Sequence, residues 1–338
     1  MKSFFTLLLF FTTNLFSLPL EVSSNEEPSL YEKLLSLDYI QSNISNKIVV
    51  FSSNLDQKAR GWVKNDANSS VQELAYLQAT NKSYIRLRMG TEANKEEGFA
   101  FLNNIRVNLR LPKTEKELYL FIGDDEDEDE DGNAKSVNMN YSETPTSVGL
   151  KYFIKSMDAF KANLFAGLRG VTNPVIKLRL QYPIAFKYVS FRPVQYVEYS
   201  LEDEFKEETQ FYFDHCLAGK KELIRLSLSR YTQTYLKGMN YSAQLSYLGV
   251  IEHEVGFQLY SNLSGRTKLN SAEPVNAKYN VIPTTGVYNY SSGIIWKQRF
   301  FKKYLFYELQ PLVEFNQQYA YNANYVFRAN IEMYFGNI

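Results

Sequence analysis

The sequence predicts an all-β protein, a transmembrane antiparallel up-and-down β-barrel of about 14 strands (about 12 is the alternative), preceded by a short helical segment. Three observations lead to this prediction. Polar and apolar residues alternate from Ser83 to the end of the chain. No internal stretch reaches the roughly 18 apolar residues that a membrane-spanning helix needs. Long connections fall at alternate positions between the predicted strands.

The alternation is clearest in the segment Phe101–Pro112. Its aliphatic residues Ile105 and Val107 alternate with Arg106 and Asn108. Successive side chains of a strand point to opposite faces of the sheet, so one face is aliphatic and the other polar. In a membrane barrel the apolar face meets lipid and the polar face lines the interior.

The same pattern recurs along the chain, and the predicted strands are Ser83–Gly90, Phe101–Pro112, Glu117–Gly123, Ser147–Met157, Phe160–Gly170, Val175–Phe186, Tyr188–Ser200, Glu208–Ala218, Glu222–Gln233, Met239–Ile251, Glu254–Gly265, Val287–Phe300, Tyr304–Asn316 and Tyr325–Asn337. Most are near the roughly 9 to 11 residues that cross a bilayer at a tilt. A soluble sandwich would have shorter strands. The two long connections, Asp124–Thr146 and Gly265–Gly286, both fall on the side predicted to face outward. Short turns on one side and long loops on the other are typical of outer-membrane barrels.

The N-terminal region divides into two segments. Residues 1–18 are typical of a secretory signal peptide, with Lys2 followed by the mostly apolar run Phe4–Phe16. The alternative is a single membrane anchor, but the run is short for a spanning helix. Residues 28–60 contain apolar residues at helical spacing and predict a periplasmic helical leader, or a plug inside the barrel. Residues 83–338 form the predicted barrel, located in the outer membrane after export.

The sequence of the last strand indicates that the outer-membrane assembly machinery is one partner of the protein. Tyr325, Phe327 and Ile331 alternate with polar residues, and the strand resembles the terminal assembly strand of outer-membrane barrels. Such strands usually end on an aromatic residue, whereas this chain ends on Ile338, so Phe335 or Ile338 must take that role. The second expected partner is the lipid bilayer.

One region carries a family resemblance. The stretches Ser83–Arg88, Glu97–Phe99 and Asn108–Thr114 are similar to an uncharacterised family of Gram-negative outer-membrane proteins with a short helical leader and a barrel. The resemblance is sharpest between Ser83 and Leu120. It implies location and fold, and no activity.

Composition removes several classes of function. The chain has 37 basic and 37 acidic residues, which gives no sign of a nucleic-acid partner. Its one cysteine, Cys216, cannot form an intrachain disulfide and is interpreted as a packing residue. The two histidines, His215 and His253, are too few for the usual transition-metal sites. We expect no cofactor.

The residues on the polar face of the predicted strands are expected to line a pore. They are Arg86, Arg88, Arg106, Arg110, Lys177, Arg179, Arg225, Glu308 and Glu314. The same polar face also carries Lys151, Lys155, Lys161, Arg169, Glu117, Asp214, Glu254 and Glu332. Charged rings in a pore bias which ions pass, so the leading function is passive diffusion of small solutes, with a bias toward anions. The alternative is a closed structural or adhesive barrel braced by Arg–carboxylate pairs.

An unbroken acidic run covers Asp124 to Asp131. Within it, Asp127, Asp129 and Asp131 match the start of a calcium loop, but Asn138 stands where a bidentate glutamate is required. A solvated surface loop is the main interpretation, and weak surface binding of Ca²⁺ is the alternative.

A hydrolase is the third hypothesis. Outer-membrane lipid hydrolases resemble one another in placing His and Ser two residues apart on one strand face. In this chain the residue two positions after His215 is Leu217, and the residue two positions after His253 is Val255. Outer-membrane proteases need a carboxylate and a histidine on one face. Asp214 and His215 are adjacent, so they point to opposite faces.

Overall fold

The computed structural model describes residues 37–48, 50, 83–110, 118–123, 146–154, 160–170, 172–217, 222–252, 255–269, 278–279 and 281–336. The strands are β1 (Tyr84–Asn94), β2 (Gly98–Arg110), β3 (Leu118–Gly123), β4 (Ser147–Ile154), β5 (Lys161–Arg169), β6 (Asn173–Gln181), β7 (Ile184–Ala185), β8 (Ser190–Ser200), β9 (Glu204–Cys216), β10 (Glu222–Gln233), β11 (Asn240–Glu252), β12 (Val255–Arg266), β13 (Gly286–Phe300), β14 (Lys302–Asn316) and β15 (Ala323–Gly336). A 3₁₀ turn, η1 (Gln317–Tyr319), lies between the last two.

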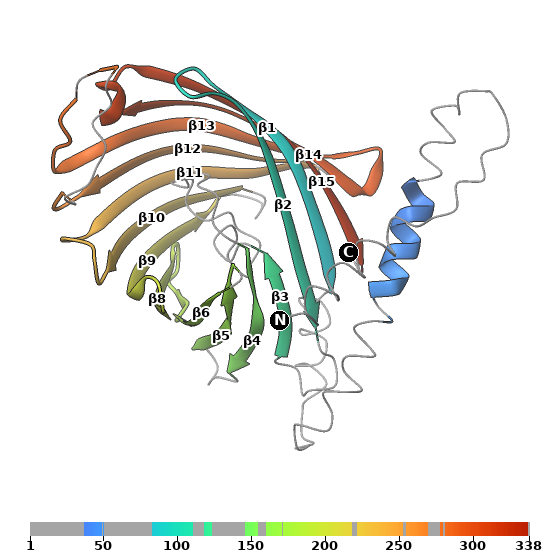
Figure 1. Cartoon of the computed structure of the whole chain (residues 1–338). Helices are drawn as coiled ribbons and strands as arrows, with labels where there is room; N and C mark the ends of the chain where they lie inside the picture. The colour runs from blue at the N-terminus through green and yellow to red at the C-terminus, as the bar shows by residue number, and fades with distance from the viewer. Residues whose placement is uncertain are drawn as a thin grey trace. The chain divides into compact units, whose positions relative to one another are not determined.

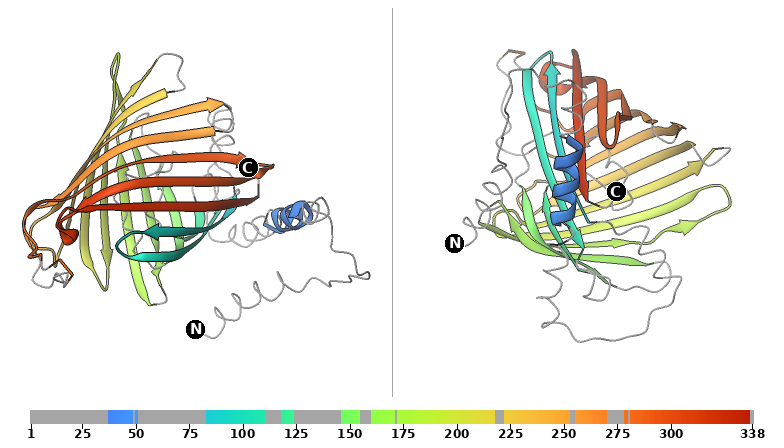
Figure 2. Two further views of the ribbon diagram at one scale, coloured as in Figure 1. Left: turned by 90° about the horizontal axis from the view of Figure 1, so that it is seen from above. Right: turned by 90° about the vertical axis from the view of Figure 1, so that its right-hand side faces the viewer.

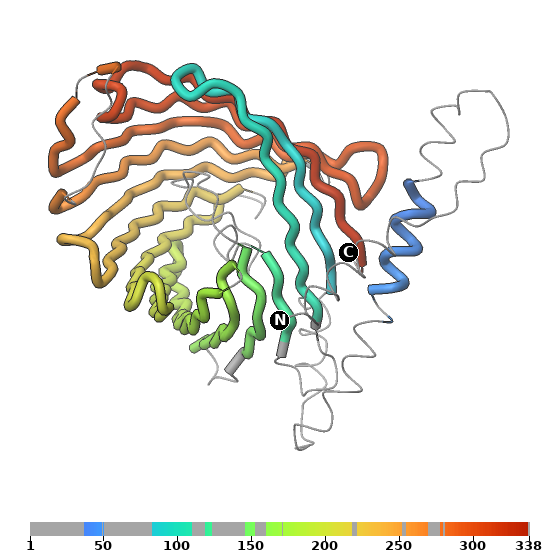
Figure 3. Tube along the Cα trace, viewed as in Figure 1, coloured from blue at the N-terminus to red at the C-terminus, as the bar shows by residue number. Residues whose placement is uncertain are grey.

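These strands close into one antiparallel barrel (Figure 1). Each strand pairs with its neighbour in sequence, and the first and last strands, β1 and β15, lie side by side along eleven register pairs from Tyr84↔Gly336 to Asn94↔Val326 (Figure 3). The short β7 continues β6, because both pair with β8 on either side of an interruption at Tyr182 and Pro183. The barrel therefore has 14 strands, as predicted. Closure leaves no strand edge unpaired, which is the condition for a sheet to cross lipid.

The two faces of the barrel have opposite chemistry. Phe101 on one face of β2 is 81% exposed, whereas Arg86 on the other face of β1 is 2% exposed. Exposed large apolar side chains recur around the barrel, and buried polar side chains occupy the alternate positions of the strands. In a closed barrel the exposed face is the outer one, so the outer face is an apolar belt and the inner face is polar. This is the arrangement that a lipid-spanning barrel requires.

The connections are sorted by length between the two ends of the barrel. We call the end where β1 begins and β15 finishes the terminal end, and the opposite end the loop end. Connections at the terminal end, such as the single residue between β13 and β14, are short. The two long connections, 124–146 and 267–285, are both at the loop end. The predicted asymmetry is therefore present in the strand order. Figure 2 shows the barrel strands from two further directions.

Several predicted strand boundaries were wrong. The strand predicted as Ser83–Gly90 runs to Asn94, and β2 begins at Gly98, so a tight turn joins them. Likewise, β9 begins at Glu204, well before the predicted Glu208. In both cases turn-forming polar residues obscured the alternation, but the hydrogen-bonded ladder continues through them.

Residues 37–48 are helical. Ile48 is 5% exposed and packs with Leu109 and Phe335, and Ile44 lies against the same cluster. The backbone N–H of Gly336 donates to the Ser45 hydroxyl at 2.8 Å. These contacts lie at the terminal end, where the first and last strands meet, and Leu109 and Phe335 are outer-face residues there. The wider assignment of residues 28–60 as a leader or plug stays a prediction.

A pair of glycines lets an aromatic ring pack across two strands. Gly149 and Gly167 are opposite one another on β4 and β5. A Cβ at Gly149 would lie 2.4 Å from the Ala166 carbonyl and 2.6 Å from the Gly167 Cα. The Phe165 ring covers the pair and is 4% exposed. Glycine is required here because only a missing side chain gives the ring room.

We expect Gly167→Ala to destabilise the barrel by about 1–3 kcal/mol, because the added methyl group overpacks a filled site. Heat-induced mobility shift on gels, with the protein in detergent, measures the loss. Gly256→Ala is the matched control, because a Cβ there meets nothing within 4 Å. Equal midpoints for the two variants would contradict the packing argument.

Candidate channel lining

The predicted lining residues lie on the inner face wherever the structure describes their side chains. Arg86 and Arg88 come from β1, Arg106 from β2, Lys177 and Arg179 from β6, Arg225 from β10, and Glu308 and Glu314 from β14. Arg110 continues the same register phase on β2, opposite Tyr119. Lys155, Glu117 and Glu254 lie outside the described residues. That solutes pass along these side chains stays a prediction.

Basic residues recur on the inner face from β1 to β10, and we call this group the basic wall: Arg86, Arg106, Lys151, Lys177, Arg179, Arg192 and Arg225. Aromatic rings pack between its members. The guanidinium carbon of Arg192 lies 4.5 Å from the centroid of the Tyr212 ring, and that of Arg225 lies 5.4 Å from the same centroid. Arg179 donates from Nε to the Tyr196 hydroxyl at 3.0 Å. These cation–π contacts and the hydrogen bond help to fix the positions of the guanidinium groups.

Arg225 of the basic wall is paired with a carboxylate. Arg225 binds Asp214 through two hydrogen bonds, from Nε at 2.6 Å and from Nη2 at 2.9 Å. Such bidentate contacts fix the guanidinium plane as well as its charge. The edge of the basic wall at β9 and β10 is therefore rigid and locally neutral.

Four inner-face carboxylates come from β1, β14 and β15, and we call Glu92, Glu308, Glu314 and Glu332 the acidic wall. Each contacts a polar or basic partner. Lys297 donates to Glu332 at 2.6 Å, and Arg328 donates to Glu92 at 2.5 Å.

Arg88 joins two members of the acidic wall. Its guanidinium binds Glu308, and its Nε lies 3.4 Å from Glu332. The Asn330 amide adds a hydrogen bond to Glu308 at 3.1 Å. Glu92, Glu308 and Glu332 are thus paired with cations from β1, β13 and β15.

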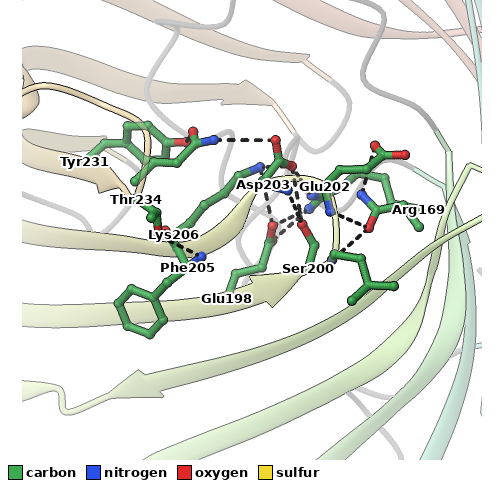
Figure 4. A network of polar contacts seen from close by, with 12 residues as sticks. Arg169, Glu198, Ser200, Glu202, Asp203, Phe205, Lys206, Tyr231 and Thr234 are labelled. Carbon is green, nitrogen blue, oxygen red and sulfur yellow. Dashed lines mark hydrogen bonds and ion pairs between the residues drawn. The ribbon is translucent and has the colours of Figure 1, made fainter.

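A second ionic cluster lies at the loop end, between β5, β8 and β9 (Figure 4). Arg169 donates to Glu198 at 2.8 Å, and Lys206 donates to Asp203 at 2.6 Å. Burial raises the pKa of Asp203, but the hydrogen bond from Lys206 and the nearby positive charges outweigh that effect and hold it below the ordinary value. The cluster braces the turn between β8 and β9.

The long connection before β13 is tied to the turn between β1 and β2. Lys278 and Tyr279 donate to Glu96 at 2.6 Å and 2.8 Å. These hydrogen bonds hold the pKa of Glu96 below its ordinary value, and the same contact raises the pKa of Lys278. A lowered carboxyl pKa means that the tie is present at neutral pH and is lost only as the pH falls through that lowered value.

We expect Glu96→Gln to speed tryptic cleavage after Lys278 several-fold in the folded protein, because the amide cannot form the ion pair that holds this lysine. Glu202→Gln is the control, since Glu202 accepts from Asn173 at a different turn. If both variants are cut at the wild-type rate, the tie does not restrain the connection.

The other candidate residues lie apart from any catalytic arrangement. The His215 ring nitrogen Nδ1 is 2.7 Å from the Tyr188 carbonyl oxygen, and His253 lies outside the described residues. Cys216 is exposed. Asp127, Asp129 and Asp131 also lie outside the described residues. Within the described ranges, no group of three His, Cys, Asp or Glu residues is arranged to hold a metal ion. No described helix is long and apolar enough to cross a membrane.

Sequence reasoning missed several inner-face residues. Arg192 was overlooked because Pro193 interrupts the alternation around it, and Lys206 because the strand was predicted to start later. Lys297 follows the inner-face alternation of β13, so the alternation itself was a sufficient signal. Tyr196 and Tyr212 follow the same phase, but aromatics there were not expected to pack against arginines.

Comparison with known proteins adds structural likeness alone. No protein-family model and no curated protein matches the chain. Among solved structures, the NanC porin matches with a TM-score of 0.36 and 8% identity, over 73% of this chain and 98% of that one. OprD of Pseudomonas aeruginosa matches with a TM-score of 0.44 and 8% identity, over 75% of this chain and 94% of that one. These scores carry no argument about function, and the barrel assignment rests on the chain's own strand pairing.

Proposed function

We propose that the protein is an outer-membrane barrel that lets small anionic solutes diffuse across the membrane. The observation that carries the proposal is the basic wall, a set of arginines and lysines on the inner face of a closed barrel. Fourteen strands exceed the roughly 8 whose interior side chains alone can fill, and fall short of the roughly 16 to 18 of wide porins. We expect a narrow path in which the basic wall favours anions.

The outer face and the chain's first residues support the proposed location. The apolar belt needs a lipid surround, and an antiparallel barrel with all long connections at one end is typical of outer membranes. Export would use residues 1–18, and insertion would use the assembly machinery acting on β15. Passive diffusion down a gradient needs no cofactor and no catalytic residue.

A test uses three sugars of one shape and different charge, namely glucuronate, glucose and glucosamine, in proteoliposomes that contain the refolded protein. Uptake is expected to fall in that order, because the basic wall attracts the anion and repels the cation. Equal rates would contradict the anion bias.

A closed structural barrel is the second candidate. Most basic-wall side chains are nearly buried, for example Arg179 at 6% and Arg192 at 5% exposure, and the acidic wall is braced by ion pairs. In the uptake assay, folded protein that admits none of the three sugars would favour this candidate over the channel.

A further inference from the structure

One polar group interrupts the apolar belt. Among the described strands, Glu207 on β9 and Arg230 on β10 are the only charged residues that face outward away from the strand ends. Arg230 donates to Glu207 at 2.7 Å. Gln195 donates to Glu207 at 3.2 Å and accepts from Thr209 at 2.8 Å. We call these four residues the lateral polar patch.

The patch lies within the belt and not beyond it. Phe205, two residues from Glu207 toward the loop end, is 46% exposed, and Phe211 on the other side of the patch is 39% exposed. Leu226 on β10 is 38% exposed. Along β9, apolar side chains therefore flank the patch in both directions, which places it at a level where lipid chains surround the barrel.

Lipid chains cannot satisfy this patch. The Arg230 side chain is 50% exposed, and its recorded hydrogen bonding among the described residues is the single contact with Glu207. A guanidinium has five N–H donors, so Arg230 has donors to offer to a further partner. A charged side chain facing lipid is costly unless protein covers it.

The chemistry of the patch identifies its occupant. It holds one cation, one anion, an amide and a hydroxyl, so its formal charge cancels and it offers donors and acceptors together. An anionic lipid headgroup would need further cations on the outer face, and the described strands supply none near it. A surface that carries both the cation and the anion, and both donors and acceptors, is complementary to the same surface on a second copy. Polar side chains are also what joins proteins within a membrane.

We propose that the outer face of β8–β10, centred on Glu207 and Arg230, is the interface through which copies of this chain associate in the membrane. Arg230 of one copy then binds acceptors of the patch on the next copy, while Glu207 keeps its own contact. The inference goes beyond the proposed transport and holds for an open or a closed barrel, but it rests on the membrane location proposed above.

The experiment measures energy transfer between copies in liposomes at a low protein-to-lipid ratio. Cys216 is the sole cysteine and is exposed, so it takes either a donor or an acceptor dye. The wild-type protein is expected to show energy transfer well above that of randomly dispersed barrels. Glu207→Arg and Arg230→Glu, each alone, are expected to lose it through repulsion between like-charged patches. An equal mixture of these two variants, one with donor and one with acceptor, is expected to restore it.

Two further variants keep the test independent of folding. The double variant Glu207→Leu with Arg230→Leu gives an outer face that suits lipid, folds like the rest of the belt, and is expected to be monomeric. The double variant Ser261→Leu with Ser292→Leu removes another hydrogen-bonded outer-face pair, joined at 2.7 Å on β12 and β13, and is expected to associate normally. Heat-dependent gel mobility establishes folding and membrane insertion for every variant.

Three outcomes would overturn the proposal. They are dispersed wild-type barrels, association that survives in the leucine variant, and failure of the charge-swapped mixture to associate. Dispersed wild-type protein whose copurified lipid is lost on Arg230→Leu would assign the patch to a headgroup instead. Failure of membrane insertion in the wild type would show up as absent gel-mobility shift, and it would count against the proposed location and not only against the interface.

Discussion

Reversing one charge of the basic wall, by Arg179→Glu, is expected to weaken or invert the anion preference of the barrel. The change replaces a fixed cation by an anion at a site where the guanidinium is held against Tyr196. At an effective dielectric constant between that of water and that of a protein surface, a charge changed by two units acts on a nearby ion with roughly 1–3 kcal/mol. This corresponds to a several-fold to hundred-fold change in the ratio of anion to cation permeability.

Reversal potentials in a salt gradient measure this ratio. Lys187→Glu is the matched control, because it changes the net charge of the chain equally at an exposed turn residue between β7 and β8. The control is expected to keep most of the wild-type preference. If both variants shift the reversal potential by the same amount, the bias arises from the overall charge of the protein and not from the basic wall.

The second large effect is expected from Glu332→Gln, which removes the carboxylate at the centre of the acidic wall. Glu332 is 1% exposed, and it faces both Lys297 at 2.6 Å and Arg88 at 3.4 Å. Without it, two cations are left close together on the inner face. Removal of one partner of a buried ion pair is strongly destabilising. Because Lys297 is about a third exposed, water screens part of the loss, and we expect the free energy of unfolding to fall by about 2–4 kcal/mol.

Urea unfolding of the refolded protein in detergent micelles gives this value. Lys297→Met added to Glu332→Gln should recover part of the stability, because it removes the cation that lost its carboxylate partner. Glu314→Gln is the control, since the Asn324 amide that donates to Glu314 at 2.7 Å can donate to glutamine as well. A loss as large for Glu314→Gln as for Glu332→Gln would show that the ion pairs are not what stabilises the acidic wall.

Much of the fold could be predicted from the sequence because the barrel depends on a two-residue period. Segments such as Tyr325–Asn337 show that period without interruption. A one-residue shift in the assignment of the faces would have turned every inner-face arginine toward lipid. The inner position of Arg106 and Arg179 followed from the same argument. Strand ends could not be predicted, because turn residues such as Glu96 and Glu204 continue a ladder that the apolar pattern no longer marks.

The contacts between side chains of the candidate site could not be predicted from the sequence. Which cation lies beside Glu332 depends on the register of β13 against β15 two strands away, and no local pattern encodes that register. The packing of Tyr212 between Arg192 and Arg225 depends on the pairing of β9 with both its neighbours. The lateral polar patch was hidden for a similar reason, since Glu207 fell outside the predicted strands and had no assigned face.

The measurement that tests the central claim most directly is single-channel conductance of the refolded wild-type protein in a planar bilayer with a salt gradient. A closed barrel with a basic wall along an open path predicts stable conductance steps and a reversal potential of the sign set by anions. Folded, inserted protein that gives no steps, or steps with a cation-selective reversal potential, would contradict it.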